Sequence, residues 1–423
     1  MSDIRHLTAE GIRDFANIAI NAYPGFKINT EEGRQRLIDR LIEAQEHIPV
    51  QHLVGLYREE QLVGGMRLHD FRMNMLGVEV GAGGVGMVAV DLLHKKEHVA
   101  KELIAFFLQH YRQQGAPLAL LYPFRPDFYY AMGFGYSTKI SQYRFRPAAL
   151  RKGGSKAHVR FLTAEDKDAL MDCYNRYQAA THGMIVRYPP EWDGWFTNLG
   201  LERRLVGYVN DGRVEGYILF GFKARPVGMN AAESPLRNDL VIREFVVTGR
   251  EALGGLLAFL SSQADQVDRI VLTTTNETFH HLLSDPRNEA ETLIPSVYHE
   301  SNVQGVGLMA RVLDVPGMFR ALASHDFNGQ NLRLRLTIRD SFLPENDGSV
   351  LIAFQHGRAT LPESGPHDAE IVLDVAEFSS LLMGAVDFQQ LYDYNLAEIS
   401  DPAYVPQVSR LFAAPKPICL TDF

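Results

Sequence analysis

The sequence has little cysteine and no long apolar run. Cys173 and Cys419 are the only cysteines among 423 residues, and they lie far apart, so neither a disulfide framework nor a thiolate metal site is implied. No apolar run approaches the ~18 residues of a membrane span, and Met1–Arg5 does not open the apolar core of a signal peptide. These absences predict a cytoplasmic protein with no membrane partner.

Basic residues are fewer than acidic residues. Lys and Arg number 42 against 51 Asp and Glu, a net charge of −9, which argues against a nucleic-acid partner and mildly favours cationic substrates. With 423 residues, 46% of them hydrophobic, the chain has room for two or three domains that each bury a core.

The stretch 83–136 is the most informative part of the chain. Val85–Val90 and Pro117–Leu121 are short apolar runs typical of strands. Between them, apolar residues recur on one helical face from His98 onward, with Lys95–Lys96 just ahead. A helix start offers free N–H groups to an anion such as pyrophosphate. The segment therefore predicts either a phosphate-binding βαβ unit or a plain one whose lysines are solvated.

A tyrosine-rich turn follows the second strand. Phe128–Phe134 resembles the Phe-Tyr-x-x-x-Gly-aromatic signature of the GCN5-related N-acetyltransferases (GNAT), in which the tyrosine faces the sulfur of coenzyme A. Gly307–Asp314 and the end of the chain, Pro417–Phe423, are similar to the corresponding segments of the Eis-type subgroup. The resemblance covers essentially the whole chain.

This resemblance implies an acetyltransferase that uses acetyl-CoA, no metal, and a small-molecule or peptide amine, such as an aminoglycoside-like polyamine or a lysine. It implies that Tyr129 is the general acid, that the terminal carboxylate of Phe423 is the base, and that the protein is a homo-oligomer. The residues that it assigns to acetyl-CoA are Met87, Val88, Ala89 and Val90 for the pantetheine arm, and Lys95, Lys96, His98, Val99 and Ala100 for the phosphates.

Transfer of an acetyl group from a thioester to an amine requires a base and is helped by an acid. An amine of pKa about 10.4 is protonated at neutral pH and must lose a proton before it attacks a thioester. A phenol of pKa near 10 that protonates a thiolate of pKa near 8.5 works against only about 2 kcal/mol. From the residues alone, Tyr129 as a core tyrosine and Phe423 as part of a frayed tail stay open as alternatives.

The phosphate loop departs from the family pattern Arg-x-x-Gly-x-Gly/Ala. Lys95, His98 and Ala100 occupy the matching positions. Lysine keeps the charge but lacks the forked guanidinium, and histidine lacks the freedom that lets glycine bring the backbone close to a phosphate. The sequence therefore predicts either that His98 joins the site or that acetyl-CoA binds weakly.

An internal sequence repeat predicts two copies of one α/β unit. Ile4–Glu10 recurs as Val159–Glu165, in each case a strand end followed by a threonine helix cap. Hairpins are expected at 53–68 and 204–222, each followed by a strand, a helix and a strand. Arg151–Lys156 is the expected linker.

The second copy is expected to lack the cofactor site. Its helix opens with Thr248–Glu251, a capping-box pattern that places a carboxylate where a phosphate would bind. Beyond residue 300, alternation in Leu332–Ile338 and Val350–Phe354 predicts antiparallel strands, accompanied by helices at 376–383 and 388–394. In the Eis subgroup this region resembles a sterol-carrier-like α+β domain.

The fold class expected is therefore α/β and α+β, with tandem GNAT-type domains followed by a sterol-carrier-like domain. The expected bounds are 1–150 for the first domain, 157–298 for the second and 300–423 for the third. Two rival functions remain. One is a non-catalytic binder of acyl-CoA or lipid on a decayed transferase scaffold, and the other is a zinc hydrolase, because His94–His98 fits His-x-x-Glu-His.

Overall fold

The computed structural model describes residues 3–151, 153–197, 199–227, 232–288, 293–294 and 297–423, which form two compact units. Met1–Ser137, Leu308–Pro417 and Asp422–Phe423 make up the first unit, and Thr138–Gly307 and Ile418–Thr421 make up the second. The domain bounds expected from the sequence stay a prediction. The expected linker at 151–156 contains neither helix nor strand where it is described, and Lys152 lies outside the described residues.

The first unit contains a seven-stranded sheet in the order β1-β2-β3-β4-β5-β16-β6. Its strands are β1 (Asp3–His6), β2 (Gln51–Arg58), β3 (Gln61–Met75), β4 (Val78–Val90), β5 (Leu118–Leu121), β6 (Gly135–Tyr136) and β16 (Met309–Val312). The hairpin expected at 53–68 is confirmed as β2 and β3. Its turn residues Glu59 and Glu60 both have positive φ, as a two-residue type I′ turn requires.

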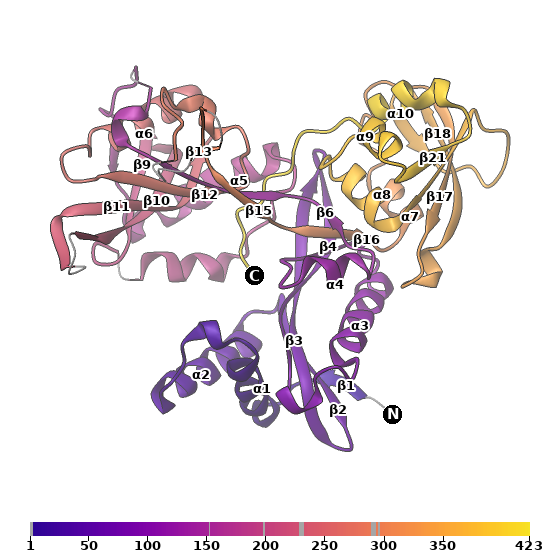
Figure 1. Cartoon of the computed structure of the whole chain (residues 1–423), viewed down its shortest axis with the longest axis horizontal. Coiled ribbons are helices and arrows are strands. Elements are labelled where there is room, and N and C mark those ends of the chain that lie inside the picture. Colours follow the sequence, from indigo (N-terminus) through magenta and orange to yellow (C-terminus); the bar gives the residue numbers. More distant parts are fainter. Residues whose placement is uncertain (1–2, 152, 198, 228–231, 289–292, 295–296) are drawn as a thin grey trace. The chain divides into compact units, whose positions relative to one another are not determined.

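Helices cover both faces of this sheet. Helices α1 (Ala9–Ala22) and α2 (Glu31–His47) lie on one side and α3 (Val99–Gln113) lies on the other (Figure 1). The Thr8 side chain accepts a hydrogen bond from the Gly11 amide, which confirms the expected threonine cap. The apolar stripe predicted from His98 onward is buried against the sheet through residues that include Val99, Leu103, Phe107 and Tyr111.

An opening between β4 and β5 positions the site. The two strands pair in parallel from Ala82–Leu118 to Val85–Leu121, and no further pair follows. Immediately beyond, β4 contains a β-bulge opposite β3, and Met87 within it has a φ of 52°. A bulge bends and twists a strand locally. The two strands therefore separate at Val85, and a tyrosine-bearing short helix, α4 (Pro126–Tyr130), follows β5.

The second unit repeats this plan. Its sheet has the order β15-β7-β12-β11-β10-β9-β8. The strands are β7 (Lys139–Phe145), β8 (Val159–Phe161), β9 (Arg204–Asn210), β10 (Arg213–Val227), β11 (Ala232–Val247), β12 (Arg269–Thr274) and β15 (Val303–Val306). Helix α5 (Lys167–Ala180) and helix α6 (Arg250–Ser261) accompany it, together with the short helices η5 (Pro189–Phe196) and η6 (Phe279–Leu282). Two copies of one α/β unit are thereby confirmed.

The chain exchanges strands between the two sheets. Strand β7 directly follows β6 in sequence, yet it pairs with β12 and β15 in the second sheet. The place beside β5 in the first sheet is taken by β16, which pairs with β5 and β6. The segment Gly307–Asp314 therefore completes the first sheet rather than only opening a third domain.

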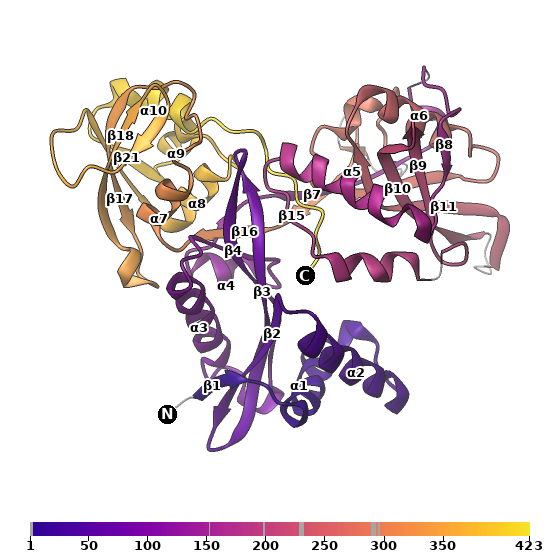
Figure 2. The ribbon, with the colours of Figure 1, turned by 180° about the vertical axis from the view of Figure 1, so that it is seen from behind.

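The remaining residues of the first unit form a five-stranded sheet with helices, drawn in orange and yellow in Figure 2. Its strands are β17 (Leu332–Arg339), β18 (Gly348–Gln355), β19 (Arg358–Thr360), β20 (Ala369–Asp374) and β21 (Ala397–Ile399), and its helices are α7 (Val315–Ala321), α8 (Val375–Leu382), α9 (Phe388–Asp393) and α10 (Val405–Leu411). The expected antiparallel pairing of β17 with β18 is confirmed, and β17 also pairs in parallel with β20.

Candidate active site

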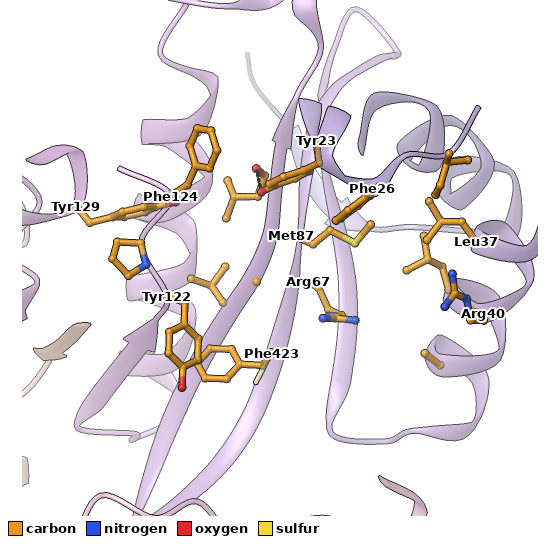
Figure 3. Close-up of a pocket in the computed structure, with 17 residues that line it drawn as sticks. Tyr23, Phe26, Leu37, Arg40, Arg67, Met87, Tyr122, Phe124, Tyr129 and Phe423 are labelled. Carbon is orange, nitrogen blue, oxygen red and sulfur yellow. Dashed lines mark hydrogen bonds between the residues drawn. The ribbon is translucent and has the colours of Figure 1, made fainter. Parts of the chain in front are cut away.

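A cavity of about 720 Å³ lies where β4 and β5 separate in the first unit (Figure 3). It is open to a ligand between the bulged part of β4, the residues after β5, and helix α2. Its lining residues are Tyr23, Phe26, Ile28, Leu37, Arg40, Leu41, Ala44, Arg67, Val85, Gly86, Met87, Val88, Tyr122, Pro123, Phe124, Tyr129 and Phe423. Both residues to which the family resemblance assigned proton transfer, Tyr129 and Phe423, therefore line one cavity.

Tyr129 is a buried residue that lines this cavity. It lies on α4, is 7% exposed, and its ring packs edge-on against Phe128 and Phe134 at centroid distances of 5.3 and 6.0 Å. Burial, with a smaller contribution from Tyr23, raises the pKa of Tyr129 to about 12. Its phenol is therefore protonated at neutral pH and has a proton to donate.

The bulge of β4 is fixed by a second tyrosine. The Tyr23 hydroxyl donates a 2.7 Å hydrogen bond to the Val88 carbonyl, and its ring stacks on Phe26 at 5.2 Å. Met87 and Val88 line the cavity, whereas Ala89 and Val90 pair with β3. Of the four residues expected to hold the pantetheine arm, the structure thus brings two to the cavity wall.

The chain ends inside the same cavity. The Phe423 ring lies 4.8 Å from the Phe71 ring, 5.4 Å from His69 and 5.2 Å from Tyr122. A Cβ atom on Gly86 would lie 2.9 Å from the terminal carboxyl carbon of Phe423. The missing side chain at Gly86 therefore makes room for the carboxylate, and the aromatic neighbours anchor the ring.

His69 beside this terminus is neutral. Burial, with the positive charge of Arg67, lowers the pKa of His69 to about 3. The Arg67 Nε–H donates to His69 Nε2 at 3.1 Å, so the histidine proton resides on Nδ1. His69 therefore presents no charge to the Phe423 ring that packs on it.

The predicted phosphate loop forms an uncapped helix start. Lys95, Lys96 and His98 are exposed, Val99 is buried and Ala100 is partly buried. His98 is the N-cap of α3, makes no side-chain cap hydrogen bond, and has a φ of 63°. The position that carries glycine in the family pattern thus adopts a left-handed conformation here with histidine, at a cost in backbone strain.

Arg58, which the sequence did not single out, neutralises the acidic groups near this helix start. Its guanidinium donates to Glu97 Oε2 at 2.9 Å and to Glu102 Oε1 at 2.8 Å. Unpaired carboxylates at a helix N-terminus would repel a phosphate. Their pairing with Arg58 leaves the first N–H groups of α3 and the two lysines compatible with an anion.

The zinc alternative is not supported by the placement of its histidines. His94 belongs to the short helix η2 (Leu92–His94) and its Nδ1 lies 3.0 Å from Glu97 Oε2, while His98 precedes α3. The two histidines do not share one helix, as His-x-x-Glu-His requires. Within the described residues no group of three or more His, Cys, Asp or Glu side chains is arranged to hold a metal ion.

In the second unit the corresponding opening is filled by protein. Strands β11 and β12 pair in parallel up to Ile242–Leu272, and beyond this pair Ile418 and Leu420 line what is left, a cavity of about 150 Å³. The Cys419 amide donates to Thr275 Oγ1 at 3.1 Å, and the Ile418 amide donates to the His182 carbonyl at 2.9 Å. Cys173 and Cys419 are both buried and form no disulfide.

A buried ion pair lies beside this filled opening. Arg187 donates through Nη1 and Nη2 to the two carboxylate oxygens of Glu244, at 3.1 and 2.8 Å, and the Tyr217 hydroxyl also donates to Glu244 at 2.5 Å. The guanidinium lies over the rings of Tyr174, Trp192 and Trp195, at 4.1 to 4.7 Å. The charges of Arg187 and Glu244 are therefore paired with each other within the second unit.

The capping box expected at Thr248–Glu251 is wrong. Gly249 is the N-cap of α6 and makes no side-chain cap. The Thr248 hydroxyl instead hydrogen-bonds with Glu215, at 2.7 Å to its carboxylate. The local sequence pattern could not indicate this competing partner, because Glu215 lies on a different element, β10.

None of the helices in the described part of the chain has the length and apolar content of a membrane span.

Three family models match the chain in succession. Two of them, both described as an acetyltransferase (GNAT) domain, match residues 3–137 and 183–312. The third, a sterol carrier protein domain, matches residues 316–420. The order of domains predicted from the sequence, two GNAT domains followed by a sterol-carrier-like domain, is confirmed.

Relatives and solved structures agree with these matches. An uncharacterized N-acetyltransferase of Streptomyces coelicolor is 32% identical over 143 residues, which span 32% of this chain and 33% of that protein. One from Streptomyces avermitilis is 23% identical over 92% of this chain and 91% of its own length. Among solved structures, a GCN5-related N-acetyltransferase from Anabaena variabilis (TM-score 0.81, 18% identity) and Eis1 from Mycobacterium abscessus (TM-score 0.76, 19% identity) share the fold over 100% of both chains.

Proposed function

The chain belongs to the GNAT acetyltransferases, and from this premise we propose that it transfers an acetyl group from acetyl-CoA to a primary amine. The observation that carries the proposal is the convergence of Tyr129 and the Phe423 terminus on one cavity, at the point where β4 and β5 separate. These two groups come from residues almost 300 positions apart in sequence, and they supply the acid and the base that the reaction needs.

The fit of acetyl-CoA is supported by the shape of the first unit. The bulge at Met87 interrupts the pairing of β4 with β3, and Met87 and Val88 line the cavity there. The start of α3 carries Lys95 and Lys96 and has its neighbouring carboxylates paired with Arg58. Met87 and Val88 would hold the pantetheine arm, and the α3 start would hold the phosphates. Acetyl-CoA supplies the acetyl group already activated as a thioester.

The Phe423 carboxylate accepts a proton from the ammonium group of the acceptor, directly or through a water. This frees the nitrogen lone pair to form the new C–N bond as the C–S bond breaks. The Tyr129 hydroxyl donates its proton to the departing sulfur. The second proton, which the nitrogen still carries after the C–N bond has formed, returns to the Tyr129 phenolate through water. Since the pKa of Tyr129 is about 12, transfer to a thiolate of pKa near 8.5 opposes the reaction by about 5 kcal/mol. Tyr129 therefore acts first as a hydrogen-bond donor and releases its proton only as charge builds on sulfur.

Turnover of acetyl-CoA with a panel of primary amines, followed by release of the free thiol, tests the proposal. Tyr129→Phe removes one hydroxyl and leaves the buried ring, so we expect acetyl-CoA affinity near wild type and a kcat lower by about 10²-fold or more. A variant with unchanged kcat would refute the assignment of Tyr129. Binding of acetyl-CoA by the wild type with no turnover on any amine would instead favour the non-catalytic acyl-CoA binder.

A further inference from the structure

The charged side chains that line the cavity are positive, although the protein as a whole is acidic. Two guanidinium groups line it, those of Arg40 on α2 and Arg67 on β3, and its described lining contains no Asp or Glu. The one negative group is the Phe423 terminus. The whole chain has a net charge of −9, so the local charge is opposite to the average charge of the protein.

Arg67 is a guanidinium without an acidic partner. It is partly buried, and burial lowers its pKa. Its Nε–H donates a hydrogen bond to the neutral His69 ring. None of the ion pairs within 4.0 Å in the described part of the chain includes Arg67. An anion from a ligand would supply the two-pronged partner that a guanidinium favours.

The rest of the wall beside the arginines is apolar. Phe26 and Ile28 precede α2, Leu37 and Leu41 lie on it, and Met87 projects from the β4 bulge. In Figure 3, Tyr129 and Arg40 stand at opposite ends of the view, with Met87 and Arg67 between them. A ligand that reaches from Tyr129 toward the arginines therefore passes along an apolar wall.

We propose that the acceptor is an amine with an apolar or aromatic body and one carboxylate, bound through Arg67 and Arg40, and that polycationic amines are poor acceptors. This inference rests on the proposed acetyl transfer. The amine lies toward the Phe423 carboxylate and Tyr129, the body lies against the apolar wall, and the carboxylate pairs with the guanidinium groups. A polycation meets two positive side chains and no acidic side chain in the described lining.

A matched pair of acceptors isolates the carboxylate. 4-(Aminomethyl)benzoate and 4-(aminomethyl)benzamide have the same body and amines of similar basicity, and spermine serves as the polycation. For the wild type we expect kcat/KM to be at least about tenfold higher for the benzoate than for the benzamide, as a charge-assisted pair gives, and spermine to be the poorest. A ratio near one, or spermine as the best acceptor, would overturn the inference.

Substitutions then identify the groups that recognise the carboxylate. Arg67→Gln is expected to bring the benzoate-to-benzamide ratio close to one, and Arg67→Lys to restore part of it. Arg40→Gln, on the exposed surface of α2, should lower the ratio by several-fold and serves if Arg67→Gln does not fold. Arg36→Gln, on the same helix, outside the lining and paired with Glu32, is the control with an unchanged ratio. Unchanged ratios in both Arg67→Gln and Arg40→Gln would overturn the inference.

Calorimetric binding separates this inference from the proposed function. Titration of 4-(aminomethyl)benzoate and of spermine into the protein, with coenzyme A present, measures the charge preference without turnover. If neither amine is acetylated but the benzoate binds more tightly, the proposed activity fails and the charge preference stands. If acetylation occurs but spermine binds more tightly, the activity stands and the charge preference fails.

Discussion

The two GNAT domains offer the same opening and use it in opposite ways. In the first, the strands part after Val85–Leu121, and a cavity of about 720 Å³ remains. In the second they part after Ile242–Leu272, and only about 150 Å³ remains beside Ile418 and Leu420. One opening can take a ligand, whereas the other is closed by the chain's own C-terminal segment.

The residues at matching positions also differ. Counted from the last parallel pair, Met87 in the first domain corresponds to Glu244 in the second. Met87 lines the open cavity, whereas Glu244 forms a buried ion pair with Arg187. The scaffold thus supplies an opening, and the segments that line or fill it differ between the two domains.

The largest expected effect comes from deletion of the last residue, Phe423, which lines the opening of the first domain. Deletion of Phe423 removes the carboxylate from Gly86 and leaves Ile418 and Leu420 in place. We expect kcat to fall by about 10²- to 10⁴-fold, the usual worth of a general base, with the unfolding midpoint near wild type. Steady-state kinetics and thermal unfolding measure the two quantities.

Three related variants sharpen this test. Extension of the chain beyond Phe423 should act like the deletion, because it displaces the terminal charge. Phe423→Ala keeps the carboxylate and loses the ring, so its kcat should lie in between. Gly86→Ala places a methyl group 2.9 Å from the terminal carboxyl carbon and should also lower kcat. Full activity in both the deletion and the extended form would remove the support for a terminal base.

The next effect concerns the buried pair of the second domain. Arg187→Met leaves Glu244 buried without its cation, and we expect a loss of about 3–5 kcal/mol in the free energy of unfolding. The double variant Arg187→Met with Glu244→Leu removes both charges and should recover most of it. Urea unfolding provides the measurement. Equal losses in the single and double variants would show that the aromatic contacts of Arg187, rather than its charge, provide the stability.

Smaller effects are expected from substitutions at the starts of α3 and α6. His98 has a φ of 63°, whereas Gly249 at the start of α6 has a φ of −162° and open space around it. His98→Gly should relieve strain of up to about 1 kcal/mol and tighten acetyl-CoA binding several-fold. Gly249→Ala should change stability by less than about 0.5 kcal/mol. Weaker acetyl-CoA binding by His98→Gly would indicate that the imidazole itself contacts the phosphates.

Sequence patterns predicted the parts of this fold that depend on local signals. Periodicity placed α3, and turn residues placed both hairpins. The Tyr-rich turn and the chain end pointed to Tyr129 and Phe423, which the structure brings to one cavity. The exchange of β7 and β16 between sheets was not predictable, because strand pairing between distant segments has no local signature.

The arginines of the site escaped prediction for a similar reason. Arg58 and Arg67 lie on strands where charged residues usually face solvent, and their roles depend on partners or cavities formed by other elements. The net charge of −9 pointed toward cationic acceptors, yet the cavity wall carries two arginines. Average charge predicts long-range attraction and says little about the few groups that line a site.

The smallest expected effect concerns the exposed lysine before α3. Lys95→Ala should raise the Kd for acetyl-CoA about two- to fivefold at low salt, since a solvent-exposed charge near a helix start contributes about 0.3–1 kcal/mol. The difference should shrink at high salt, where exposed charges are screened. Arg250→Ala, at the start of α6 in the second unit, is the matched control and should leave the Kd unchanged. A loss of affinity that is equal at all salt concentrations would mean that Lys95 acts by packing, and a change in Arg250→Ala would mean that the second unit also binds the cofactor.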